Sequence, residues 1–97
     1  MAAYIIAEIE VKNPDKYSQY RDEVPKTVNQ FGGRYIIRGN NIVPLEGDWE
    51  PERLVVIEFP DMASLKRWYE SDKYKSIRNM RITSTSSKVI AIDGAWS

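Results

Sequence analysis

The 97-residue chain contains no cysteine and no histidine. Without cysteine there is no disulfide framework, no thiolate nucleophile and no Cys-ligated zinc or iron–sulfur site. Without histidine, the commonest acid/base near neutral pH and the commonest metal ligand are both missing. These absences exclude a Ser-His-Asp triad, a zinc-hydrolase site and a His-ligated haem. We therefore expect a protein that works without a metal and without a cofactor.

The charges are balanced, with 14 basic and 14 acidic side chains. This balance argues against a strong general attraction to nucleic acid or to an anionic membrane. No apolar run approaches the roughly 20 residues needed to cross a bilayer, and the N-terminus lacks the pattern of a signal peptide. We expect one small cytoplasmic domain over residues 1–97, with no membrane association.

The first half of the chain has clear element signals. Strict alternation of apolar residues over 4–12 predicts a strand with one buried face. Asn13 is a good helix N-cap and Pro14 fits the first helical position, and an apolar stripe at helical spacing follows. Pro25 lies inside this helix and should kink or split it. The glycines at 32–33 should end it.

The remaining elements follow from the same patterns. The sequence predicts a strand over 34–38, a turn or bulge at 39–41 and a resumed strand over 42–46. A further strand is predicted over 53–59, followed by a helix that starts at Asp61 and bends near Ser71-Asp72. A polar connection over 83–87 should then lead to a last strand over 88–93. The order β-α-β-β-α-β predicts a ferredoxin-like α+β fold, with a four-stranded antiparallel sheet and both helices on one of its faces.

The other face of this sheet should be uncovered. From the alternation in each strand we expect it to carry Tyr4, Ile6, Glu8, Arg34, Ile36, Arg38, Leu54, Val56, Glu58, Val89 and Ala91. A monomer rarely exposes so many aliphatic side chains together. The simplest solution is a homodimer in which two sheets face each other.

Several segments resemble a known family. They are Phe31-Gly32-Gly33-Arg34-Tyr35, the stretch 45–53, Val55-Val56-Ile57-Glu58-Phe59-Pro60 and the stretch 68–74. Together they make the chain similar to the domain-of-unknown-function 1330 family from Tyr4 to Gly94. That family is similar in fold to the dimeric α+β barrels, which include cofactor-independent monooxygenases and muconolactone isomerases. The resemblance implies a dimer but no particular reaction. It cannot extend to the relatives that rely on histidine.

Arg34, Arg38 and Glu58 are the strongest candidate cluster, with Glu8 near them on the expected uncovered face. One interpretation is a pocket in which the guanidinium groups hold a carboxylate or enolate. Glu58, with a raised pKa, would then act as the catalytic base. The other interpretation is a structural Arg–Glu pair that fixes the dimer, or a solvated rim.

Aromatic residues form a second candidate group on the two helices. They are Tyr17, Tyr20, Trp68, Tyr69 and Tyr74. They could line a flat cleft for an aromatic or polyketide-like substrate. The alternative is an ordinary core between helices and sheet.

Two further residues are candidates for substrate binding. Trp49, in a loop between strands, would either cover a pocket or dock on a partner subunit. Arg81, which follows the expected second helix, would either stabilise that helix through its dipole or contact a ligand, as the family resemblance implies.

Metal, nucleotide and RNA sites lack their signatures. There is no calcium-binding loop and no glycine-rich phosphate loop. The strand over 53–59 lacks the exposed aromatic pattern of an RNA-recognition module, which has the same element order. We expect no metal site and no nucleic-acid partner.

These observations lead to one main functional hypothesis. The chain would be a homodimer that binds a small organic acid or aromatic metabolite, with monooxygenase- or isomerase-like turnover as an extension of that binding. Arg34, Arg38 and Glu58 would orient and deprotonate the ligand, while Tyr69, Tyr74 and Trp49 would shape its pocket. The alternative is a non-catalytic binding or interaction module whose barrel serves dimer assembly alone.

Overall fold

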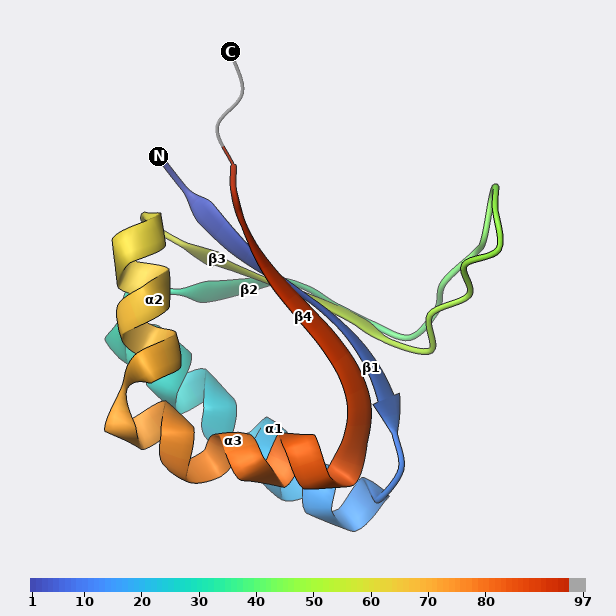
Figure 1. Ribbon diagram of the computed structural model, residues 1–97, viewed down its shortest axis with the longest axis horizontal. Helices are drawn as coiled ribbons and strands as arrows, with labels where there is room; N and C mark the ends of the chain where they lie inside the picture. The colour runs from blue at the N-terminus through green and yellow to red at the C-terminus, as the bar shows by residue number, and fades with distance from the viewer. Residues whose placement is uncertain (95–97) are drawn as a thin grey trace.

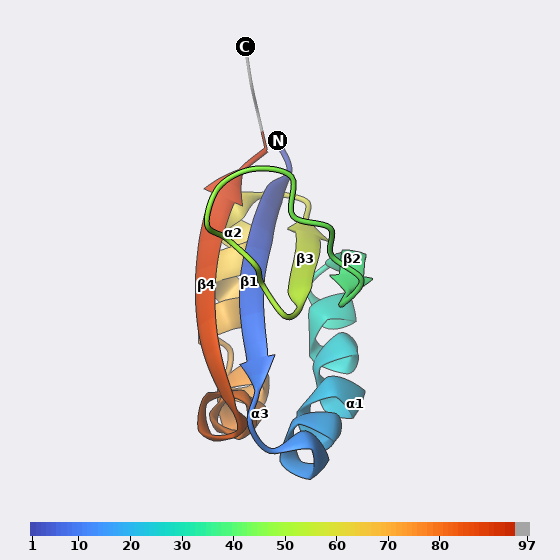
Figure 2. The ribbon, with the colours of Figure 1, turned by 90° about the vertical axis from the view of Figure 1, so that its right-hand side faces the viewer.

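The computed structural model describes residues 1–94. Its elements are β1 (Ala3–Val11), α1 (Pro14–Gln30), β2 (Arg34–Gly39), β3 (Leu54–Phe59), α2 (Met62–Glu70), α3 (Asp72–Ser84) and β4 (Thr85–Asp93). The strands form one antiparallel sheet in the order β2-β3-β1-β4. All three helices cover one face of this sheet and leave the other uncovered (Figures 1 and 2). The predicted ferredoxin-like α+β fold is confirmed.

The helix starts follow from local capping. The Asn13 side chain accepts a hydrogen bond from the Lys16 backbone N–H at the start of α1, and Asp61 accepts one from Ser64 at the start of α2. Ser71 separates α2 from α3 and caps α3, as a serine at this position can. The bend predicted near this residue is therefore confirmed.

The split that Pro25 could cause in the first helix does not occur. α1 is a single helix that runs through Pro25, because a proline removes only one backbone hydrogen bond while the apolar stripe still packs on the sheet. The glycines end the helix as predicted. Gly32 has a positive φ of 79°, and a side chain on Gly33 would collide with Val28 and Phe59.

The core lies between the helices and the inner face of the sheet. Alternate residues of the two central strands are buried there: Ala3, Ile5, Ala7 and Ile9 of β1, and Val55, Ile57 and Phe59 of β3. The helices contribute an aromatic layer over these aliphatic side chains, formed by Tyr17, Tyr20, Trp68 and Tyr74.

The uncovered face, here called the open face, is fixed by the strand register. It carries Tyr4, Ile6, Glu8, Arg34, Ile37, Leu54, Val56, Glu58, Lys88, Ile90 and Ile92. The assignment of Val89 and Ala91 to this face is wrong, because they pair with Ala7 and Ile5 and so face the core side. Residues 89–92 are apolar without alternation, so the sequence cannot decide which of them face inward.

A β-bulge in β2 changes which side its later residues face. Arg34 pairs with Glu58 and Tyr35 with Ile57, but the register then shifts by one residue, so that Arg38 pairs with Val55. The extra residue in the bulge sends Arg38 to the helix-covered side of the sheet. The prediction that Arg38 shares a face with Arg34 is therefore wrong.

The polar stretch before the last strand and the end of the second strand also differ from prediction. Residues 83–87 are not a connection, because α3 continues to Ser84 and β4 starts at Thr85. Residues 40–53, here called the arm, form no strand, so the resumed strand predicted over 42–46 is absent. The arm leaves the sheet and projects on the side of the open face (Figures 1 and 2).

None of the helices within residues 1–94 combines the length and the apolar character that a membrane crossing requires.

Candidate functional site

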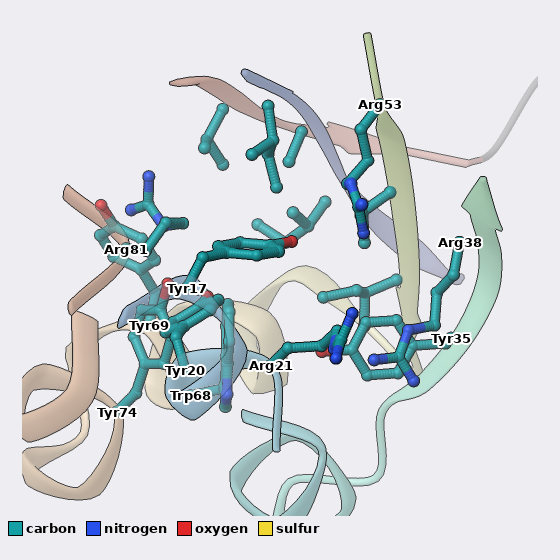
Figure 3. Close-up of a pocket in the computed structure, with 16 residues that line it drawn as sticks. Tyr17, Tyr20, Arg21, Tyr35, Arg38, Arg53, Trp68, Tyr69, Tyr74 and Arg81 are labelled. Carbon is teal, nitrogen blue, oxygen red and sulfur yellow. Dashed lines mark hydrogen bonds between the residues drawn. The ribbon is translucent and has the colours of Figure 1, made fainter. Parts of the chain in front are cut away.

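A cavity lies between the inner face of the sheet and the aromatic layer of the helices (Figure 3). Its interior volume is about 50 Å³. It is therefore a narrow slot that can hold a few water molecules or a small planar group. Its lining is aliphatic on the strand side and is otherwise dominated by tyrosine and arginine.

Four arginines face this cavity and come from four different parts of the chain. They are Arg21 of α1, Arg38 of β2, Arg53 at the end of the arm and Arg81 of α3. Among the described residues, no aspartate or glutamate lines the cavity. The ion pairs formed within residues 1–94 are Lys12–Glu10, Lys26–Glu23 and Arg34–Glu58, and none of them involves a cavity arginine. The cavity thus concentrates positive charge without a carboxylate to balance it.

Arg81 is the most buried of these arginines, with 6% of its surface exposed. Its Nη1 donates a hydrogen bond of 2.6 Å to Ser87 Oγ. Burial lowers the pKa of Arg81, but the adjacent phenols of Tyr74 and Tyr20 outweigh burial and raise it, so the group stays charged. A buried guanidinium is costly to desolvate unless an anion or several acceptors surround it, and the acceptor that Arg81 bonds here is the Ser87 hydroxyl.

Two of the other arginines, Arg38 and Arg53, rest on aromatic rings. The guanidinium carbon of Arg38 lies 4.5 Å from the centre of the Tyr35 ring, and that of Arg53 lies 5.4 Å from the Tyr17 ring. These cation–π contacts hold each charge without neutralising it. Figure 3 shows Arg21, Arg38 and Tyr35 together at one side of the cavity and Arg81 at the other.

Tyrosine hydroxyls supply the polar groups between these charges. Tyr20 and Tyr74 share a buried hydrogen bond of 2.9 Å between their hydroxyl oxygens. Burial and the nearby Tyr74 phenol raise the pKa of Tyr20. Burial likewise raises the pKa of Tyr35, against the opposing effect of Arg38. Tyr20 and Tyr35 therefore remain protonated, and their hydroxyls can donate hydrogen bonds to an anion.

Trp68 is the buried indole of the aromatic layer, and it packs against Tyr74 and Phe59. Its ring lies 4.1 Å, centre to centre, from that of Tyr74 and 5.3 Å from that of Phe59. Its Nε1 donates a hydrogen bond of 2.9 Å to Thr27 Oγ1. The predicted aromatic candidates thus both build the core and line the cavity, so the two interpretations of that group are compatible.

The predicted site residues are divided between three places. Arg38, Tyr69, Tyr74 and Arg81 line the cavity. Arg34 and Glu58 lie on the open face, across the sheet from it. Trp49 lies on the arm, is 57% exposed and is outside the cavity lining. The structure therefore does not bring Arg34, Arg38 and Glu58 together.

The pKa expected for Glu58 is also wrong in direction. Arg34 Nε donates a hydrogen bond of 2.7 Å to Glu58 Oε1, and the Tyr4 hydroxyl donates one of 2.9 Å to Oε2. The Arg34 bond, followed by the Tyr4 bond, lowers the pKa of Glu58. A carboxylate stabilised in this way is a weak base, so the geometry favours the structural interpretation of this pair.

Three cavity residues were not predicted from the sequence: Arg21, Tyr35 and Arg53. Two of them had a usable signal. Arg21 follows Tyr17 by four residues and so lies on the same face of α1. Arg53 precedes Val55 by two residues and so shares its inward face. Tyr35 lies on the inward face of β2, as its alternation with Arg34 indicated. The predicted register had no bulge and placed Arg38 on the opposite face, so no charged residue beside Tyr35 suggested a binding site.

No group of three or more metal-ligating side chains occurs within residues 1–94. The lining instead offers guanidinium groups, phenols and one indole, which together suit a small anion with an aromatic or planar body. Within the described lining there is no carboxylate or imidazole to act as a base.

Comparisons with known proteins agree with this architecture. A family model described as a domain of unknown function, DUF1330, matches residues 2–95. No curated protein gives a significant match.

Three solved structures illustrate the structural likeness. The RPA0582 protein of unknown function from Rhodopseudomonas palustris is 14% identical with a TM-score of 0.81, covering 99% of this chain and 84% of its own. A dimeric ferredoxin-like protein of unknown function from Jannaschia sp. CCS1 is 13% identical with a TM-score of 0.78, covering 96% and 99%. SnoaB, a cofactor-independent oxygenase from Streptomyces nogalater, is 8% identical with a TM-score of 0.70, covering 99% and 95%. At these identities the likeness establishes the fold.

Proposed function

The chain belongs to the DUF1330 family, and from that premise we propose that its cavity binds a small organic acid or an acidic aromatic metabolite as an anion. The observation that carries this proposal is the set of four arginines around one cavity, with no carboxylate in the described lining. Positive charge held this way in a partly desolvated space attracts an anion more strongly than it would in water.

The depth of each arginine supports a division of roles. Arg81 is buried, so it would meet the charged end of a ligand that has fully entered. Arg21 and Arg38 are exposed and Arg53 is half-buried, so they would attract the ligand and close over it. Tyr69 and Tyr74 would contact its planar body.

The small size of the empty cavity limits the ligand. A benzene-sized guest needs roughly 150 Å³, and the interior here is about 50 Å³. Either the ligand is small, or the side chains at the opening move aside. Exposed Arg38 and half-buried Tyr69 have the freedom to do so.

A thermal-shift comparison of benzoate with benzamide tests the charge requirement. The two have the same shape, but only benzoate is an anion. Binding to the folded state raises the midpoint by mass action, by about 2.7 kcal/mol at a concentration of 100 Kd. We expect benzoate, or another acid in a panel of small carboxylates and phenols, to raise the midpoint more than its neutral amide.

Substitutions of cavity residues test whether the benzoate-induced rise in the thermal midpoint comes from binding in the cavity. Arg38→Gln and Arg81→Lys should reduce the benzoate shift, and the lysine keeps a buried charge at position 81. Arg67→Gln is the matched control, because Arg67 is exposed on α2 and bonds to Ser64 Oγ outside the cavity. Equal shifts with acids and amides, or full shifts in the cavity variants, would contradict the proposal.

Stabilisation of an enolate or phenolate is the chemistry that this cavity would favour. Guanidinium groups lower the pKa of a bound enol or phenol by stabilising its anion. SnoaB, which shares the fold at a TM-score of 0.70, is a cofactor-independent oxygenase. Monooxygenase- or isomerase-like turnover stays a prediction, and so does the alternative of a non-catalytic binding module.

We also propose that the protein is a homodimer joined through the open face. The aliphatic side chains of that face include Ile90 at 58% and Ile92 at 48% exposure, and the Jannaschia structure is described as dimeric. Sedimentation equilibrium tests this. A mass near the 11.3 kDa of one chain at micromolar concentration would contradict it. A cytoplasmic location stays a prediction.

A further inference from the structure

The arm extends further from the rest of the molecule than any other described segment. Figure 1 shows it leaving the ends of β2 and β3 and running clear of the sheet and helices. Figure 2, turned by 90°, shows it in front of the open face, opposite the helices. The two views together place the arm beside the space that a partner on the open face would occupy.

Large apolar side chains on the arm are exposed to solvent. Val43 is 73% exposed and Leu45 is 89% exposed, and Trp49 at 57% is also open to solvent. Single exposed apolar residues are ordinary, but several on one projecting loop beside an apolar face mark an interaction site. Exposed apolar side chains thus occur both on the arm and on the open face, where Ile90 and Ile92 are exposed.

The arm is held at several points by its own chain, while Val43 and Leu45 stay exposed. The Arg53 carbonyl accepts a hydrogen bond of 2.9 Å from the Ile9 backbone N–H. Trp49 Nε1 donates one of 3.3 Å to Glu8 Oε1 on the open face, and Pro51 is buried. These contacts set the direction of the arm, so little ordering is needed when a partner binds.

The arm enlarges the surface that the sheet alone offers to a partner. The arm supplies additional apolar surface next to the sheet.

The charges suit a second copy of the same chain. The arm segment 46–52 carries four acidic residues, Glu46, Asp48, Glu50 and Glu52, and no basic one. The open face carries Glu8 and Glu58 as well as Lys88 and Arg34, and Arg34 is paired with Glu58. Its basic groups are the more exposed ones, since the Arg34 side chain is 74% exposed and that of Glu58 is 22% exposed. In a two-fold dimer each acidic arm meets the basic groups of the partner's face, and the contact repeats symmetrically.

We infer that the arm of each copy clasps the flank of the second copy packed on the open face, with Val43 and Leu45 as its apolar contacts. This inference rests on the proposed homodimer. It adds that the dimer is held by the arms as well as by the sheet.

The dimer dissociation constant tests the clasp. Val43→Ser combined with Leu45→Ser should weaken the dimer at least tenfold in sedimentation equilibrium and leave the circular dichroism spectrum unchanged, because these side chains contribute nothing to the core. Ile82→Ser is the matched control, since Ile82 is 53% exposed on α3, away from the open face. It should leave the dissociation constant unchanged.

The outcomes separate the two proposals. If the wild type is a dimer and the arm variant has the same dissociation constant, the clasp is overturned and the sheet dimer stands. If the wild type is a monomer, both the dimer and the clasp fail, whereas benzoate binding is tested independently in the cavity.

The absence of cysteine offers a second measurement that does not depend on affinity. Leu45→Cys gives the chain one thiol, which can carry a benzophenone crosslinker. Irradiation should yield a covalent dimer in high yield, with the attachment on the partner's sheet or flank. The same label on Ile82→Cys should yield little dimer. Crosslinks confined to the labelled chain itself would overturn the clasp.

Discussion

Arg34 and Arg38 lie four residues apart on one strand and face opposite sides of the sheet. The register shift between Tyr35 and Ile37 is the cause. One arginine therefore pairs with Glu58 on the open face, while the other lies over Tyr35 at the opening of the cavity. A single inserted residue separates a structural ion pair from a candidate ligand-binding charge.

This separation predicts that only one of two matched substitutions lowers the affinity for a ligand in the cavity. Arg38→Gln should lower the affinity for a carboxylate ligand by roughly tenfold, the loss of one charge-assisted hydrogen bond of about 1.5 kcal/mol, and leave the dimer mass unchanged. Arg34→Gln should leave ligand affinity unchanged, because its side chain is on the other face. Isothermal titration and sedimentation equilibrium distinguish the two. A loss of affinity in Arg34→Gln alone would reverse the assignment.

The Glu58 carboxylate predicts a loss of stability in acid. Because hydrogen bonds from Arg34 and Tyr4 lower its pKa in the folded state, the folded protein binds this proton less tightly than the unfolded chain does. The stabilisation is therefore present at pH values above the ordinary glutamate range near 4.3 and is lost as the pH falls through the lower folded-state value.

Urea unfolding of Glu58→Gln checks this. The wild type should be more stable than the variant at pH 7, and the difference should shrink toward pH 3. Glu70→Gln serves as the control, since Glu70 is exposed and forms no ion pair with any residue in 1–94. A difference between wild type and Glu58→Gln that stays constant with pH would show that the carboxylate is not stabilised in the fold.

The Tyr20–Tyr74 hydrogen bond predicts coupled substitutions. Tyr20→Phe or Tyr74→Phe alone leaves a buried hydroxyl without its partner and should cost about 1–3 kcal/mol in the free energy of unfolding. The double variant should cost less than the sum of the two. The coupling in a double-mutant cycle, measured by urea denaturation, should be about 0.5 kcal/mol or more. Strict additivity would mean that the bond contributes nothing.

Trp68 predicts a large loss of stability when its ring is removed. It is 2% exposed, so Trp68→Ala should destabilise the fold by about 3–5 kcal/mol. Trp68→Phe retains most of the ring packing but loses the bond to Thr27, and should cost less. Trp49→Ala is the contrasting variant, because its exposed indole should leave the monomer's unfolding free energy within about 0.5 kcal/mol. A small effect at Trp68 would contradict its place in the core.

Most of the fold could be predicted because its signals are local. The alternation from Ile5 to Ile9, the Asn13 cap and the Ser71 break act within one turn of helix or one run of strand. The faces of β2 and β4 could not be predicted in this way. In β2 the bulge has no glycine to mark it, and in β4 the run from Val89 to Ile92 is apolar on both sides.

The candidate site was predicted in part for the same reason. Tyr69 and Tyr74 follow the helical stripe, so their direction toward the core was readable. The position of Arg38 depends on the register of a strand far from it in the sequence. Arg81 and Tyr74 both belong to α3 and both line the cavity. This placement depends on how α3 packs on the rest of the fold, so no local sequence pattern predicts it.

The chemistry of the cavity lining makes its charge almost independent of pH. Its cations are arginines, a residue type that is always charged in this pH range. Burial raises the pKa of Tyr20 and Tyr35 above the ordinary phenol value, so neither phenol loses a proton near neutrality. The charge of the cavity lining therefore stays constant near neutral pH. Any change in ligand affinity between about pH 5 and 8 reports the ionisation of the ligand itself, and the midpoint of that change gives the acidity of the molecule that this cavity selects.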